Sequence, residues 1–177
     1  YFRNSIVSDP VFHRDNTKTN TPAFIYFDLV PGEHLILSIL AKGGGAENMS
    51  ALRMLSPSVG KKGIVDFVME TVIYADGKPC PPTIVGIGVG GDFEQCTILS
   101  KKALLRPLGS HHEMEEWANL EKELLAAIND TGIGPQGLGG KTTALAVHIE
   151  TMPCHIASLP VAINLQCHSH RYKTVIL

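Results

Sequence analysis

Apolar residues recur at helical spacing in two long stretches of the chain. Within residues 56–75 they fall at i, i+3, i+4, i+8 and i+11 from Ile64, which places them on one face of a helix ended by Asp76-Gly77. A second helix is predicted after Ser110 and Glu113, whose spacing matches a capping box, and it runs to Gly132. A third helix is expected over residues 93–105.

Shorter apolar and β-branched runs, bounded by turn residues, predict strands. Residues 1–22 are polar and turn-rich, which predicts an extended loop. Residues 23–30 and 34–40 are split by Pro31-Gly32 and are expected to form a hairpin. Later strands are expected over residues 83–89, 144–150, 159–166 and 172–177. The order of elements predicts one mixed α/β domain over residues 1–177, with a central, mixed sheet flanked by helices.

Length and charge narrow the classes of function. The chain has 177 residues, which is the size of about one domain, and its net charge of −2 argues against a general nucleic-acid binder. No apolar run reaches about 18 residues, so we expect no membrane span. The four cysteines include no C-x-x-C pair and no signal peptide precedes them, which favours reduced thiols and a cytoplasmic protein. The chain begins at Tyr1 rather than Met, and we expect it to be a piece of a longer protein.

Two glycine-rich segments resemble nucleotide-binding motifs incompletely. Residues 86–91 match G-x-G-x-x-G, but no acidic residue follows about 20 residues later at a second strand end, so close backbone approach is the favoured interpretation. Residues 134–142 resemble a P-loop, but five residues rather than four separate Gly134 from Gly140-Lys141. A nucleotide-binding domain built on Gly140-Lys141-Thr142 is the competing function. An anion-binding nest with Lys141, or a structural turn, remains open for this loop.

Cysteine and histidine supply the candidate chemistry. Cys80 lies between prolines, and a rigid loop of this kind suits a metal or cluster ligand, although a buried small residue is the commoner role. Cys167 is followed by His168 and His170, and this group could bind zinc as readily as it could supply a ligand to a cluster. Cys96 falls inside a predicted helix and is expected in the core. His155 could be a ligand, an acid or base, or a loop histidine.

A colinear series of motifs resembles one family. The series comprises Arg3-Asn4-Ser5, Asn20-Thr21-Pro22, residues 41–48, Pro79-Cys80-Pro81-Pro82, Gly90-Gly91, residues 132–143, residues 152–161 and Gln166-Cys167. On these motifs the chain resembles the iron–sulfur class I fumarases and their relatives the L-tartrate dehydratases over essentially its whole length, and most closely their separate α-subunit form.

The resemblance implies a [4Fe–4S] cluster held by three cysteines with one iron left open. Cys80 and Cys167 match two of these ligands; the third belongs to a Cys-Gln-Asp-Thr-Gly motif that is absent here, together with its catalytic acid. Arg3, Gly44, Gly45 and His155 match substrate-binding positions. The family's proposed base and further substrate-binding residues lie in a β subunit or C-terminal β domain. The resemblance therefore implies an oligomer with that partner, and a chain inactive alone.

The function implied is reversible hydration of fumarate to malate, a hydro-lyase reaction with the open iron as Lewis acid and a dicarboxylate as substrate. The alternative is dehydration of L(+)-tartrate to oxaloacetate by the same chemistry. A non-enzymatic alternative is a structural or binding domain of the same fold without a cluster.

Overall fold

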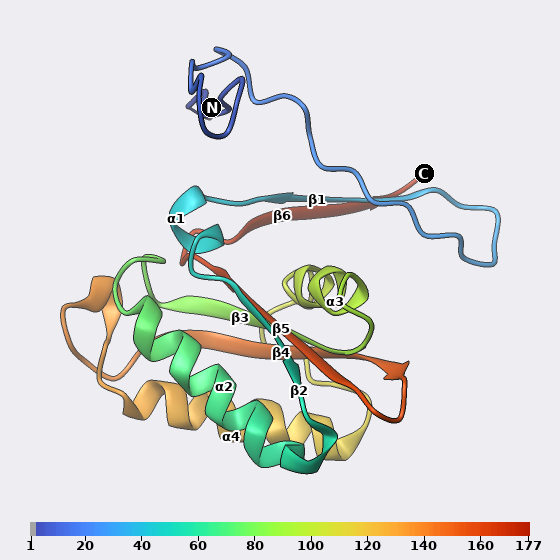
Figure 1. The fold of residues 1–177 in the computed structure, drawn as a ribbon, viewed down its shortest axis with the longest axis vertical. Coiled ribbons are helices and arrows are strands. Elements are labelled where there is room, and N and C mark those ends of the chain that lie inside the picture. The colour runs from blue at the N-terminus through green and yellow to red at the C-terminus, as the bar shows by residue number, and fades with distance from the viewer. Residues whose placement is uncertain (1–2) are drawn as a thin grey trace. The chain divides into compact units, whose positions relative to one another are not determined.

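The computed structural model describes residues 3–177 in two units, which divide after Leu35 (Figure 1). In the first unit the chain forms turns held by local hydrogen bonds, including a β-bridge between Val7 and Asn16. The loop predicted for residues 1–22 is confirmed from residue 3 onward, but it folds back into turns instead of being extended; residues 1–2 lie outside the described part. The strand predicted over residues 23–30 is wrong: this segment has no strand pairing, and Phe27 and Leu29 are almost fully exposed.

A four-stranded mixed sheet forms the centre of the second unit. Its strands are β2 (Ala51–Leu55), β3 (Thr83–Gly91), β4 (Ala144–Cys154) and β5 (Leu159–Gln166), in the spatial order β2-β5-β3-β4. β3 and β4 are parallel, whereas β5 runs antiparallel to both β2 and β3. The predicted α/β fold class with a mixed sheet is confirmed, and β2 is a strand that the sequence pattern did not reveal.

Helices cover both faces of this sheet (Figure 1). α2 (Gly60–Ala75) and α4 (Glu115–Asp130) pack on one face, where their apolar stripes meet alternate strand residues such as Val85, Ile87 and Ile149. α3 (Gln95–Ala103) lies on the other face and contains buried Cys96, as expected. A Cβ at Gly88 would lie 2.0 Å from the carbonyl oxygen of Cys96, so this glycine lets α3 approach β3.

The predicted early hairpin is replaced by a long-range pair. β1 (Ile36–Ala41) pairs antiparallel with β6 (Arg171–Ile176), not with residues 23–30. Leu40 attaches this ribbon to a small apolar cluster of Ile84, Leu104 and Ala146. The short helix α1 (Gly44–Glu47) follows β1, and the 3-10 turns η1 (Pro57–Val59) and η2 (Pro135–Gly137) complete the elements.

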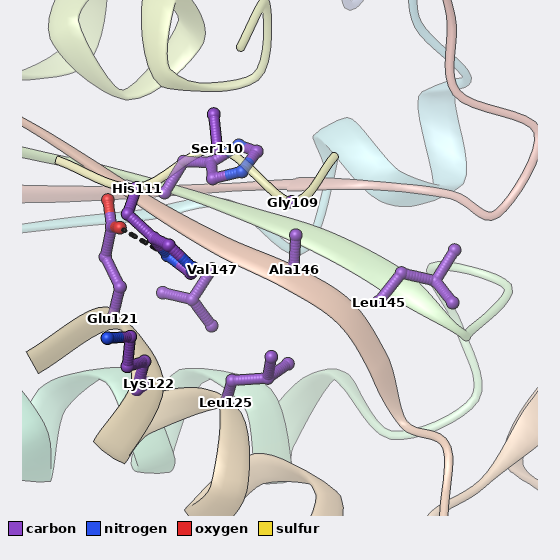
Figure 2. A pocket seen from close by; sticks show the side chains of 10 residues that line it. Gly109, Ser110, His111, Glu121, Lys122, Leu125, Leu145, Ala146 and Val147 are labelled. Carbon is purple, nitrogen blue, oxygen red and sulfur yellow. Dashed lines mark ion pairs between the residues drawn. The ribbon is translucent and has the colours of Figure 1, made fainter. Parts of the chain in front are cut away.

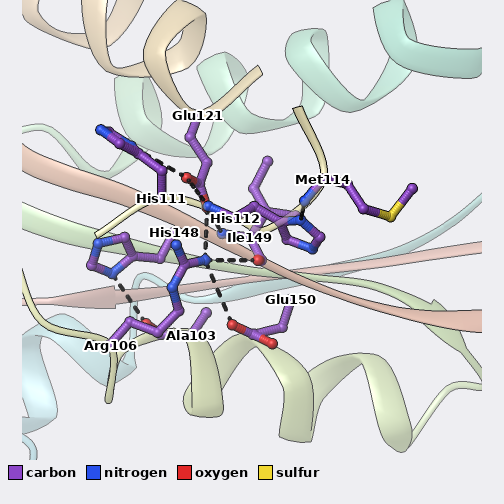
Figure 3. A network of polar contacts seen from close by, with 9 residues as sticks. All are labelled: Ala103, Arg106, His111, His112, Met114, Glu121, His148, Ile149 and Glu150. Carbon is purple, nitrogen blue, oxygen red and sulfur yellow. Dashed lines mark hydrogen bonds and ion pairs between the residues drawn. The ribbon is translucent and has the colours of Figure 1, made fainter. Parts of the chain in front are cut away.

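The start of α4 differs from the predicted capping box. The helix begins at Glu115 after an extended Met114, and no side chain caps it. The Ser110 hydroxyl is instead buried without a partner, and the Met114 N–H donates to His112 Nδ1 at 3.0 Å. The preceding loop is held by Glu121, which accepts the His112 N–H (Figure 3). Among residues 3–177, no helix is long and apolar enough to cross a membrane.

Candidate functional site

Two cysteine-bearing loops meet at one edge of the sheet. Cys80 lies just before β3 and Cys167 just after β5, and the antiparallel pairing of Ile84 with Gln166 brings both ends to the same edge. The His168 N–H donates to the Cys80 carbonyl oxygen at 3.3 Å, and His168 Nδ1 lies 3.1 Å from that oxygen. The structure therefore brings the two predicted ligand loops into direct contact.

The glycine-rich loop before β4 packs against these two loops. The Gln136 backbone N–H and side-chain Nε2 both donate to the Pro81 carbonyl oxygen, at 2.8 and 3.0 Å. A Cβ at Gly77 would lie 2.9 Å from the Gln136 carbonyl oxygen, so the two backbones are in close contact. Of the two roles left open for this loop, the structure gives evidence for the structural turn. The sequence pattern did not single out Gln136.

The thiol of Cys167 lies in a polar environment. Burial raises the pKa of this thiol, but hydrogen bonds from the Ser169 hydroxyl, 3.0 Å away, and from backbone N–H groups outweigh burial and lower the pKa overall. A lowered pKa increases the thiolate fraction, and the thiolate is the form that binds metals. The Cys80 side chain is exposed, and its backbone has a left-handed φ of 57°.

A third segment borders the cysteine loops. Gly45, in α1, approaches the carbonyl oxygen of Lys78, to which an added Cβ would come within 3.2 Å. Lys42, whose side chain is 11% exposed, donates to the Leu165 carbonyl oxygen and pairs with Glu47 at 2.8 Å. Burial lowers the pKa of Lys42, while Glu47 and the nearby Cys167 act in the opposite direction. Gly44 and Gly45 thus lie in the segment that adjoins Cys167.

The other two predicted substrate-binding residues lie apart from the cysteines or outside the second unit. Arg3 is an exposed residue of the first unit, where its carbonyl oxygen accepts the Ser5 hydroxyl. His155 lies in the turn between β4 and β5, where its Nδ1 accepts the Ala157 N–H. This turn is at the opposite end of β5 from Cys167, a span of about 26 Å for eight residues at roughly 3.3 Å each. Within one chain, His155 is therefore remote from both cysteines.

A model of the family described as fumarate hydratase (fumerase) matches residues 1–176. The chain belongs to this family. The resemblance inferred from the motifs is thereby confirmed.

Similar proteins within the fumarate hydratase family carry related names. A putative L(+)-tartrate dehydratase subunit alpha of Methanocaldococcus jannaschii is 53% identical over 163 residues, which cover 89% of this chain and 57% of that protein. The L(+)-tartrate dehydratase subunit alpha of Escherichia coli O157:H7 is 36% identical over 171 residues, which cover 94% of this chain and 56% of that protein. The same subunit of Escherichia coli strain K12 is 35% identical with the same coverage. The chain spans a little over half the length of these curated relatives.

The residues at the sheet edge fit part of the iron–sulfur centre that this family implies. Two thiols lie on touching loops, one of them with a lowered pKa, and thiolates are the ligands that such clusters require. Among residues 3–177, no three His, Cys, Asp or Glu side chains are grouped to hold a metal ion. The zinc alternative would use His170 as a ligand. Both ring nitrogens of His170 are buried without hydrogen-bond partners, and burial lowers the pKa of this ring.

A separate pocket lies beside β4, and it contains none of the predicted site residues. Its volume is about 60 Å³, and its lining includes Ser110, His111, Glu121 and His148 (Figure 2). Glu121 is 2% exposed and accepts hydrogen bonds from Arg106 at 2.8 Å and from the Ile149 N–H at 2.8 Å (Figure 3). These contacts join α4, the loop before it and β4, which indicates a structural role.

Proposed function

We propose that the chain is the core of the α subunit of an iron–sulfur hydro-lyase that dehydrates L(+)-tartrate to oxaloacetate. The observation that carries this proposal is the contact between the Cys80 and Cys167 loops through His168. The names of the similar proteins favour tartrate over fumarate. Tartrate was the alternative, and not the first choice, of the motif-based interpretation, so fumarate is the substrate against which the proposal is tested.

In this proposal Cys80 and Cys167 hold two positions of a [4Fe–4S] cluster, and the third thiolate comes from outside this sequence. When bound, such a cluster supplies an open iron that serves as a Lewis acid toward the departing hydroxyl. Hydrogen bonds at Cys167 favour its thiolate form. The buried ammonium of Lys42 places a positive charge beside that thiolate, which offsets negative charge at the site.

The substrate is bound at its two carboxylates in this proposal. The backbone N–H groups of Gly44 and Gly45 would donate to one carboxylate, and the Arg3 guanidinium would hold a carboxylate through two parallel hydrogen bonds. His155 would donate its ring N–H. Because His155 is remote from the cysteines of its own chain, a second copy would have to supply it, in the oligomer with a β partner that we propose.

The test is turnover of the anaerobically assembled α/β complex on L(+)-tartrate and on fumarate, with iron and sulfide measured in parallel. We expect tartrate to give the higher kcat/KM, and stoichiometric iron and sulfide. Cys80→Ser and Cys167→Ser should abolish both activity and iron, whereas Cys96→Ser, in the core, should retain most of each. A complex that binds ATP in calorimetry but contains no iron would replace this proposal with the nucleotide-binding alternative.

A further inference from the structure

Gln136 has a left-handed backbone conformation, which favours glycine. In the loop before β4, Gly132, Gly134, Gly137, Gly139 and Gly140 all have positive φ, as does Gln136 at φ 57° and ψ 14°. A side chain in the left-handed region is unfavourable, so glycine would adopt this backbone at lower cost. The glutamine side chain makes contacts at this position that a glycine could not make.

The amide of Gln136 lies at the junction of the two cysteine loops. Nε2 donates to the carbonyl oxygen of Pro81, the residue after Cys80, at 3.0 Å. The same nitrogen lies 3.4 Å from Nδ1 of His168, the residue after Cys167. The His168 backbone N–H donates to the Cys80 carbonyl oxygen, and in the tautomer with its proton on Nε2 the His168 ring accepts the Gln136 amide at Nδ1, so Gln136 closes a ring of contacts around the two loops.

We propose that Gln136 is a positioning residue whose side-chain amide holds the Cys80 and Cys167 loops together for joint metal ligation. Its backbone seats the glycine-rich loop on Pro81 and Gly77, and this packing needs no side chain. The amide adds the link to His168. Its removal should therefore loosen the pairing of the thiols while the fold remains intact. The metal-binding role of the two thiols rests on the proposed function, whereas the role of Gln136 in holding the two loops together does not.

The experiment measures how fast a short bifunctional thiol reagent, dibromobimane, bridges Cys80 and Cys167 in the metal-free chain. The chain carries Cys154→Ser to remove the other exposed thiol, and the bridged peptide is identified by mass spectrometry. Gln136→Gly removes the side chain and relieves the backbone, and Gln136→Glu keeps the length but removes the donor. We expect both variants to bridge about tenfold more slowly than the parent, which corresponds to one net hydrogen bond.

Leu138→Ala is the matched control, because Leu138 lies in the same loop with its side chain 87% exposed. It should bridge at the parent rate, and the Gln136 variants should still unfold cooperatively, with a free energy of unfolding within about 1.5 kcal/mol of the parent. A parent chain that does not bridge, or a Gln136→Glu variant that bridges as fast as the parent, would overturn the proposal. Slower bridging in a protein whose α/β complex contains no iron would refute the proposed function and leave the positioning role standing.

Discussion

The buried carboxylate of Glu121 offers a sharp test of how the sheet is held to α4. Its two oxygens accept hydrogen bonds from Arg106 and from the backbone N–H groups of Ile149 and His112, at 2.8, 2.8 and 3.0 Å. Glu121→Gln preserves the volume but removes the charge and converts one acceptor oxygen into a donor. An amide at this position cannot accept all three hydrogen bonds, so at least one buried donor loses its acceptor.

The loss of stability expected for Glu121→Gln has two contributions. A buried donor without an acceptor costs about 1–3 kcal/mol. Arg106, only 16% exposed, also loses its buried counter-ion, and breaking a buried ion pair by removing one partner costs roughly 3–5 kcal/mol in all. Glu150, at 3.5 Å from Arg106, supplies part of the missing charge, which places the expected loss at the lower end, about 3 kcal/mol.

Glu123→Gln is the matched control on the same helix. Glu123 pairs with Lys61 at the surface, where a salt bridge contributes about 0–1 kcal/mol. The measurement is urea unfolding of both variants at neutral pH, followed by circular dichroism. We expect Glu121→Gln to lower the free energy of unfolding by about 3 kcal/mol and Glu123→Gln by less than about 1 kcal/mol. Equal losses in the two variants would refute the argument that burial and shared hydrogen bonds make Glu121 special.

Three further predictions concern pH, packing and substrate binding. Burial and, second, the nearby Arg106 lower the pKa of His148, so the folded state binds a proton less readily than the unfolded chain. The free energy of unfolding should therefore fall as the pH drops below about 6.5. Urea midpoints measured at two pH values should fall less in His148→Gln than in the parent protein. Gly88→Ala should lower the free energy of unfolding, measured by thermal unfolding, by about 3 kcal/mol, because the added Cβ would lie 2.0 Å from a carbonyl oxygen of α3. Gly43→Ala is the control and should leave the stability nearly unchanged, because the space around Gly43 is open. In the assembled complex, Arg3→Lys should lower kcat/KM roughly ten- to a hundredfold by loss of bidentate binding, and unchanged kinetics would remove Arg3 from the site.

The periodic elements could be predicted because one buried face determines each of them. The apolar stripe from Ile64 to Ala75 and the buried run of β3 appear in the structure where the pattern places them. The apolar run of residues 23–30 has the composition of a strand, but composition does not specify a pairing partner. β1 instead pairs with β6, about 130 residues later in the chain, through contacts such as the hydroxyl pair Ser38–Thr174.

The candidate site was predictable only where a motif marks it. Cys80 and Cys167 could be named from the family motifs, and the antiparallel strands explain why they meet. Gln136 and Lys42 could not be assigned roles from the pattern, since each acts through tertiary contacts: a left-handed backbone against Pro81 in one case, and a buried ion pair in the other. A glutamine among left-handed glycines is the sequence signal that could have drawn attention to this loop.

The glycine motif of β3 lies toward the opposite end of the strand from Cys80. In α/β sheets the ligand crevice usually lies at the carboxyl ends of the parallel strands. Here a Cβ at Gly90 would lie 1.8 Å from the Met152 carbonyl oxygen, and one at Gly88 would meet α3, so these glycines allow the close approach of β4 and α3 to β3. The amino ends of β3 and β4 instead carry long loops that interlock through Pro81, Gln136 and His168. The G-x-G-x-x-G pattern therefore serves packing, and the two cysteine loops lie at the opposite end of β3.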